Sequence, residues 1–211
     1  ADADRIALVS EKGEIVGEEM SLALAVDYTL GRRKGPVVVN MSTSRVIDDI
    51  CRKHGVDLYT TPVGEVNVAK KMREVGAVIG GEGNGGVINP AVGPGRDSLA
   101  AIGLVLEMYA QKNRPLSSIV EEFPRYEIVK EPVECPRGES SLLLRKLTEK
   151  YKGEKVDLSD GLKVMWEDSW IHVRRSATEP VVRIIAEART REKAEALYRE
   201  VHEFIQGFVG G

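Results

Sequence analysis

A short segment near the C-terminus gathers the side chains that proteins use to bind an anion. Arg174, Ser176 and Thr178 occupy alternate positions between two apolar runs, so a strand is expected to lead into a short loop and a second strand to leave it. A guanidinium matches two oxygens of a phosphate, and hydroxyl and backbone N–H groups supply neutral donors. The alternative is that both hydroxyls only satisfy a turn while the arginine is solvated. Composition alone leaves both interpretations open.

A second polar segment lies earlier in the chain, where the glycine-rich run 80–86 follows an apolar run and contains Glu82 and Asn84. Ligands of α/β proteins bind at such strand ends. A carboxylate accepts hydrogen bonds from vicinal hydroxyls, and an amide both donates and accepts, so the pair suits a sugar. A nucleotide-binding loop is the alternative, since the spacing approaches G-x-G-x-x-G, but an acid at its second position would repel a pyrophosphate.

The chain begins with two acids at alternate positions, Asp2 and Asp4, followed by Arg5 and an apolar run. Carboxylates spaced in this way can converge on a hard divalent cation such as Mg²⁺. Two solvated acids at a frayed terminus are the alternative interpretation.

The elements expected to position these segments fall into two groups. Helices are predicted over 17–30, 44–54, 66–75 and 97–111, and they alternate with short apolar strands over 36–40, 56–60 and 77–80. This alternation is typical of an α/β domain with a mixed, mostly parallel sheet and helices on both faces. After residue 122 the pattern changes to strands over 126–133, 162–166, 170–173 and 181–187 with helices over 140–151 and 191–208. That order predicts a small α+β domain with an antiparallel sheet.

Composition excludes several classes of function. The net charge of −3 argues against a nucleic-acid-binding protein, which normally carries a basic face. No apolar run approaches the roughly 20 residues needed to cross a bilayer, and no secretory leader opens the chain, so no membrane partner and a cytoplasmic location are expected. Cys51 and Cys135 lie far apart without metal-ligand spacing and are interpreted as reduced and structural.

Three motifs resemble those of the α-D-phosphohexomutases, the family of phosphoglucomutase, phosphomannomutase and phosphoglucosamine mutase, and they follow the family order along the chain: metal loop, sugar loop, phosphate loop. The segment Arg174 to Pro180 is similar to the family's phosphate loop R-x-S-x-T-E-P. Glu82 stands at the carboxylate of its sugar loop G-E-x-S-G-H, while Asn84 replaces the serine and Gly86 the histidine. Asp2, Asp4 and Arg5 fit the end of its metal loop D-x-D-x-D-R. The G-E-G-N-G-G form resembles archaeal-type members, including phosphoglucosamine mutases.

The resemblance implies a role for each of these segments. Arg174, Ser176 and Thr178 would bind the substrate phosphate that is not being transferred, while Glu82 and Asn84 would contact the sugar. Arg175 stands where the family often has proline, and its contact with substrate stays open.

The resemblance also implies supporting residues, domains and a metal. Thr61 and Gly64 belong to a segment similar to a loop that borders the family's active site. The expected domains are 1–12, the tail of the metal-loop domain, then 13–122, the sugar-binding domain, and 123–211, a phosphate-binding domain resembling the TATA-binding-protein fold. The first metal-loop aspartate would precede Ala1, so Mg²⁺ is expected in the full-length enzyme and not in these residues alone.

The implied activity is the interconversion of hexose 1-phosphate and 6-phosphate through a bisphosphorylated sugar and an enzyme phosphoserine. That serine would lie in N-terminal domains of the same polypeptide, and these 211 residues alone are expected to be inactive. The partners expected are a hexose phosphate and those missing N-terminal domains. Two alternatives stay open, a phosphosugar-binding module without catalysis and a protein of unrelated activity, and the motifs leave the choice among glucose, mannose and glucosamine open.

Overall fold

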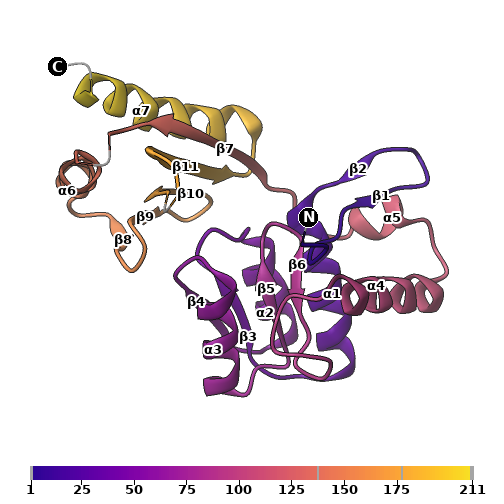
Figure 1. Cartoon of the computed structure of the whole chain (residues 1–211). Helices are drawn as coiled ribbons and strands as arrows, with labels where there is room; N and C mark the ends of the chain where they lie inside the picture. The colour runs from indigo at the N-terminus through magenta and orange to yellow at the C-terminus, as the bar shows by residue number, and fades with distance from the viewer. Residues whose placement is uncertain (1, 137, 177, 210–211) are drawn as a thin grey trace. The chain divides into compact units, whose positions relative to one another are not determined.

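The computed structural model describes residues 2–136, 138–176 and 178–209. The chain divides into two compact units, unit 1 up to Pro124 and unit 2 from Arg125 (Figure 1). No helix of the described residues combines the length and apolar character that a membrane span requires.

Unit 1 is an α/β unit built on a four-stranded sheet in the order β4-β3-β5-β6. Its elements are β1 (Leu8–Val9), β2 (Ile15–Val16), α1 (Glu18–Arg32), β3 (Val37–Asn40), α2 (Val46–His54), β4 (Leu58–Thr61), α3 (Glu65–Val75), β5 (Ile79–Glu82), β6 (Gly86–Ile88), α4 (Ser98–Lys112) and α5 (Leu116–Val120). Strands β3, β4 and β5 are parallel, and β6 pairs with β5 antiparallel. Consecutive apolar residues of β3 are buried because both of its faces are covered.

Helices cover both faces of this sheet, as adjacent glycines of β5 demonstrate. A Cβ added at Gly80 would lie 2.6 Å from Met72 Sδ of α3, and one added at Gly81 would lie 2.8 Å from Leu22 Cδ1 of α1. Neighbouring residues of a strand point to opposite faces, so α3 packs on one face and α1 on the other. Helix α1 also packs against α2 and α4.

Two glycines end helices as the sequence predicts, and a third does not. Gly55 and Gly76 follow α2 and α3 in the left-handed conformation, with φ of 66° in both. Helix α1 instead continues through Gly31 to Arg32, because its C-cap, Arg33, leaves the helix in an extended conformation.

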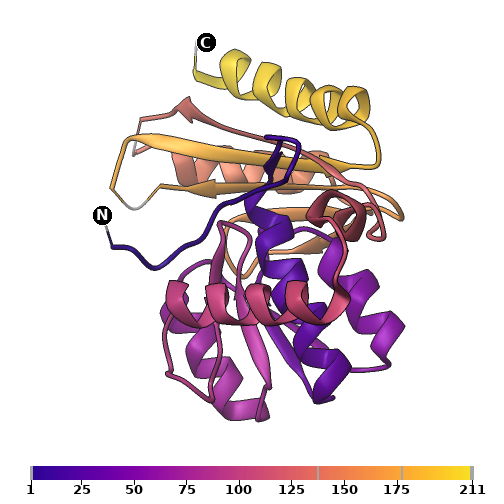
Figure 2. The ribbon, with the colours of Figure 1, turned by 90° about the vertical axis from the view of Figure 1, so that its right-hand side faces the viewer.

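Unit 2 is an antiparallel sheet with both of its helices on one face. Its elements are β7 (Glu127–Glu134), α6 (Ser140–Lys150), β8 (Lys155–Asp157), β9 (Leu162–Met165), β10 (Trp170–Arg175), β11 (Val181–Ala188) and α7 (Arg191–Val209), and the strand order is β7-β11-β10-β9-β8. Ile171 and Ile184 of the sheet share one buried cluster with Leu143 of α6 and Val201 of α7. Figure 2 shows α7 lying lengthwise along the sheet.

The predicted fold class is therefore confirmed: a mostly parallel sheet covered by helices, and a separate α+β unit with an antiparallel sheet. The short strands β1, β2, β6 and β8 and the short helix α5 were not predicted, since two to five residues carry too little periodicity.

Candidate functional site

Glu82 lies at the carboxyl edge of the parallel strands, where the predicted sugar-site residues gather. Asn40, Thr61 and Glu82 are the last residues of β3, β4 and β5. The Glu82 side chain is buried and accepts hydrogen bonds from Asn40 Nδ2 at 2.8 Å, Gly64 N at 3.1 Å and Arg96 Nη1 at 2.7 Å. A carboxylate has about four lone-pair sites, so one remains for a ligand hydroxyl.

The glycine-rich segment forms a tight hairpin between β5 and β6. Strand β5 extends through Glu82 and β6 begins at Gly86, so only Gly83, Asn84 and Gly85 form the turn. Gly85 has a φ of 85°, which favours glycine. The Asn84 Oδ1 atom accepts a hydrogen bond from Gly86 N at 3.1 Å, so part of this amide is used to close the turn.

The predicted loop residues Thr61 and Gly64 lie at the same edge of the sheet. Thr61 is buried, and its hydroxyl donates to Pro62 O at 3.0 Å. Gly64 has a φ of 126° and donates its backbone N–H to Glu82. Gly64 therefore supports the Glu82 carboxylate through its backbone.

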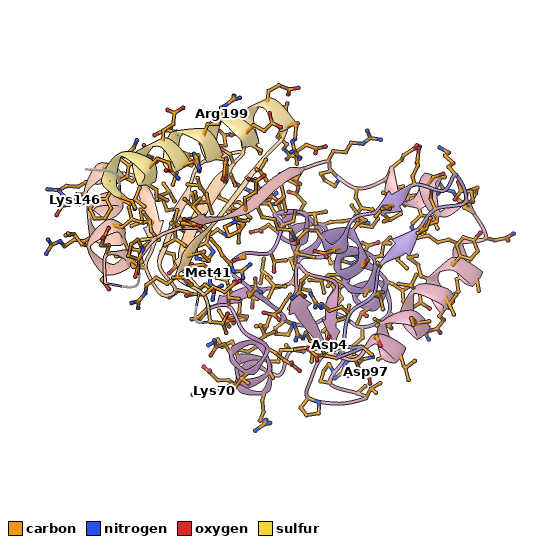
Figure 3. All side chains as sticks on the ribbon, turned by 45° about the horizontal axis from the view of Figure 1, so that its top comes forward. Asp4, Met41, Lys70, Asp97, Lys146 and Arg199 are labelled. Atoms are coloured by element: carbon orange, nitrogen blue, oxygen red, sulfur yellow. The ribbon has the colours of Figure 1, made fainter. Side chains whose placement is uncertain are left out.

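The N-terminal acidic segment lies against the hairpin and the start of α4. Ile6 N donates to Gly85 O at 3.1 Å, and Ser98 Oγ donates to Ala3 O at 2.6 Å. The labelled side chains Asp4 and Asp97 mark these two segments in Figure 3. Asp4 pairs with Arg96 Nη2 at 2.6 Å, whereas Asp2 is exposed.

As a candidate metal centre, this segment is incomplete. Asp2 and Asp4 offer the carboxylate oxygens that Mg²⁺ prefers, but one Asp4 oxygen is held by Arg96. Within the described residues no group of three His, Cys, Asp or Glu side chains could hold a metal ion. The two carboxylates fit part of a magnesium site, and that site stays a prediction.

Arg96 is a central residue of this site that the sequence did not reveal, as are Asn40 and Glu65. Its guanidinium contacts three carboxylates: Asp4, Glu82 and Glu65, whose Oε2 lies 3.3 Å from Nε. The Arg96 backbone N–H also donates to Glu65 Oε1 at 2.7 Å. Arg96 follows the run Gly93-Pro94-Gly95, which carries no motif.

Gly83, at the first position of the turn, lies against the Glu19 carboxylate. Any side chain at position 83 is therefore expected to destabilise the fold. A Cβ at Gly83 would lie 2.1 Å from Glu19 Oε1, and this carboxylate accepts the Ser44 backbone N–H at 2.9 Å. We expect Gly83→Ala to lower the free energy of unfolding by about 1–3 kcal/mol. Gly93→Ala is the matched control, because nothing lies within 4 Å of its added Cβ. Urea unfolding measures both variants, and equal stability of the two would contradict the packing described.

In unit 2 the three predicted phosphate ligands come together at the end of β10. The Ser176 Oγ atom lies 3.5 Å from Thr178 Oγ1 and accepts Glu179 N at 3.3 Å. Ser176 N donates to Val181 O at 2.9 Å, which closes the loop between β10 and β11. Ala177, between the two hydroxyl residues, lies outside the described residues.

A pocket of about 620 Å³ opens beside this loop. Its lining includes Arg174, Arg175 and Ser176 together with Ser140 in the first turn of α6. Arg174 Nε donates to Asp160 Oδ2 at 3.1 Å, so the two Nη groups are the part of this fork that can meet an anion. Arg175 Nη1 donates to Ser141 Oγ at 3.3 Å, which holds this arginine towards α6.

Both parts of the chain match domain models of one protein family. Residues 17–126 match the model of phosphoglucomutase/phosphomannomutase α/β/α domain III, and residues 133–204 match that of the C-terminal domain of the same family. The chain belongs to the phosphoglucomutase/phosphomannomutase family. The resemblance to this family drawn from the motifs is thereby confirmed.

Individual relatives agree with this assignment. A probable phosphoglucosamine mutase of Methanopyrus kandleri is 38% identical, over 99% of this chain and 47% of its own length. A phosphoglucomutase/phosphomannomutase of Thermococcus kodakarensis is 37% identical, over 92% of this chain and 43% of its own. A Burkholderia thailandensis family protein of known structure is 25% identical with a TM-score of 0.83, covering 98% of this chain and 45% of that one. The chain spans about half the length of the relatives it matches.

Proposed function

We propose that this chain is the substrate-recognition part of an α-D-phosphohexomutase that interconverts hexose 1-phosphate and hexose 6-phosphate. A phosphoserine supplied by N-terminal domains outside these residues transfers its phosphoryl group to the free hydroxyl of the hexose monophosphate. This yields serine and a hexose 1,6-bisphosphate, which reorients and returns the phosphoryl group at its other end to the serine. The observation that carries the proposal is that Arg174 and Ser176 line one open pocket, with the Thr178 hydroxyl beside that of Ser176, in a chain of this family.

The phosphate loop holds the phosphate that stays on the sugar. The Nη groups of Arg174 offer two parallel N–H donors, and the hydroxyls of Ser176 and Thr178 add neutral ones. The first turn of α6, which includes Ser140, lies at the same pocket, and N–H groups at a helix start favour an anion.

The hairpin of unit 1 holds the sugar ring. The remaining lone-pair site of Glu82 accepts a ring hydroxyl, and the Asn84 amide at the hairpin turn contributes a second polar group. Glucosamine, glucose and mannose phosphates are the substrates to compare, since relatives carry both the phosphoglucosamine mutase and the phosphoglucomutase/phosphomannomutase names.

Asp2 and Asp4 contribute to the magnesium site of the complete enzyme. When bound there, Mg²⁺ neutralises charge on the transferred phosphoryl group. We place the reaction in the cytoplasm, where thiols stay reduced. In support, Cys51 and Cys135 are free and buried, and burial raises the pKa of the Cys51 thiol to about 12, so it stays protonated.

An NMR titration of the ¹⁵N-labelled chain with glucose 6-phosphate tests the phosphate loop. Thr178→Val and Ser176→Ala are each expected to weaken binding about ten-fold, because each removes a hydrogen bond to a charged group. Thr148→Val is the matched control, since the Thr148 hydroxyl donates within α6 to Leu144 O at 2.8 Å. Unchanged affinity in the Thr178→Val and Ser176→Ala proteins would argue against this assignment of the loop.

A second experiment separates the enzyme from a non-catalytic phosphosugar-binding module. The chain alone is expected to give no interconversion of glucose 1-phosphate and glucose 6-phosphate. Addition of the N-terminal half of the Methanopyrus kandleri relative, with glucose 1,6-bisphosphate as phosphoryl donor, is expected to restore turnover. Retained binding without turnover in that mixture would favour the module.

A further inference from the structure

Gly86 lies against the Arg96 side chain, which leaves no room for a side chain at position 86. A Cβ built at Gly86 would lie 2.3 Å from Arg96 Cδ and 3.1 Å from Arg96 Cγ. Gly86 does not adopt a positive φ, so its backbone is open to other residues and the obstacle is space alone. The methylene groups of Arg96 therefore occupy the volume that a side chain at position 86 would fill.

The guanidinium of Arg96 is directed to the place where the sugar is proposed to bind. Nη1 donates to Glu82 Oε2 at 2.7 Å, and Nη2 lies 2.6 Å from Asp4 Oδ2. Each terminal nitrogen carries two N–H groups, and each of these contacts accounts for one. About 17% of the Arg96 side chain is exposed, whereas the Glu82 side chain is 4% exposed. The Arg96 side chain is thus more accessible to a ligand than that of Glu82.

Gly86 stands where the sugar loop of the family has a histidine, so the hairpin of this chain carries no side chain at that position. We propose that Arg96 replaces that histidine: it fills the space before Gly86, orients the Glu82 carboxylate and donates an N–H to a sugar hydroxyl. The inference rests on the proposed function and adds a specificity residue to it. The cation comes from the loop before α4 and not from the hairpin itself.

This replacement has a chemical consequence for recognition. A guanidinium is charged at every physiological pH and offers a planar fork, so it holds Glu82 and a hydroxyl at the same time. An imidazole offers at most one donor from each ring nitrogen and is charged only in part near neutral pH. Arg96 therefore gives the site a donor that does not depend on a protonation equilibrium.

A stability cycle tests whether Gly86 and Arg96 share one space. Gly86→Ala in the wild type is expected to lower Tm by about 3–10 °C, because the added methyl group meets Arg96 Cδ. In the Arg96→Ala background the same substitution is expected to change Tm by less than about 2 °C. Equal Tm losses in both backgrounds would overturn the proposal.

Ligand binding tests the role itself and does not depend on the Arg96→Ala protein folding. For wild type and Arg96→Lys, titration of the ¹⁵N-labelled protein followed by amide NMR measures the affinity for glucose 6-phosphate and for inorganic phosphate. Arg96→Lys is expected to weaken glucose 6-phosphate binding about five- to ten-fold and to leave inorganic phosphate binding unchanged, since lysine lacks the fork. Arg174→Lys, in the phosphate loop, is expected to weaken both.

The two ligands separate the failure of this inference from the failure of the proposed function. A wild type that binds glucose 6-phosphate no better than inorganic phosphate would overturn both. A preference for glucose 6-phosphate that persists undiminished in Arg96→Lys would overturn the assignment of Arg96 alone and leave the mutase proposal intact.

Discussion

Arg96→Met is expected to lower the free energy of unfolding by about 3 kcal/mol, because it leaves three carboxylates without their shared cation. The Glu82 side chain is 4% exposed and Asp4 16% exposed, so water replaces little of the lost interaction. The expected loss of stability is at the lower end of the range for breaking a buried ion pair, because Asn40 and Gly64 still donate to Glu82 and the Glu65 side chain is 35% exposed. Equilibrium urea unfolding measures the change.

Arg52→Met is the matched control for this experiment. The Arg52 side chain is 73% exposed and pairs with Asp49, three residues earlier, at 2.9 Å. Exposed pairs of this kind contribute little, so a change within about 0.5 kcal/mol is expected. A loss in Arg96→Met no larger than that of Arg52→Met would show that the three carboxylates do not depend on Arg96.

Lowering the pH from 7 to 4 is expected to destabilise the protein by about 3 kcal/mol through His172 alone. His172 is fully buried on β10, and burial lowers its pKa to about 4. The positive charges of Lys163 and Arg174 act in the same direction, whereas the hydrogen bond to Asp160 O and the Asp160 charge oppose it. The unfolded chain gains a proton near pH 6.5 and the folded chain only near pH 4. Stability is therefore complete above pH 6.5 and decreases as the pH falls between these two values.

His172→Gln isolates this contribution, because an amide N–H can still donate to Asp160 O, which lies 2.6 Å from His172 Nε2. Other acids also titrate in this range, so the informative quantity is the difference in free energy of unfolding between the variant and the wild type. That difference is expected to shift by about 3 kcal/mol in favour of the variant between pH 7 and pH 4. Parallel pH profiles of the two proteins would contradict the prediction.

The sequence by itself determined the two kinds of unit and the composition of both loops. Apolar residues recur with helical or strand spacing over 4 to 19 residues in the main elements, and this local pattern is sufficient to predict them. The phosphate loop was predictable for the same reason: Arg174, Ser176 and Thr178 lie within five positions, so any loop joining β10 to β11 keeps them together.

Only the tertiary structure decided how the Glu82 carboxylate is held. Its donors come from Asn40, Gly64 and Arg96, which lie 42, 18 and 14 residues away along the chain. They meet because the order β4-β3-β5 brings the carboxyl ends of three strands to one edge and the antiparallel β6 returns the chain to the start of α4. Contacts between side chains at such separations depend on strand order and turn geometry, which hydrophobic periodicity does not encode.

The same distinction explains Arg174 and Gly86. Arg174 was expected to face a phosphate, but its Nε donates to Asp160, 14 residues earlier, because β9 pairs with β10 and brings the turn before β9 beside the loop after β10. From the sequence, position 86 showed only that glycine replaces the family's histidine. The structure places the Arg96 side chain in the space that a side chain at position 86 would fill. Residue types and spacing thus identify which groups can bind, and the packing of distant segments decides which atoms of those groups remain available for a ligand.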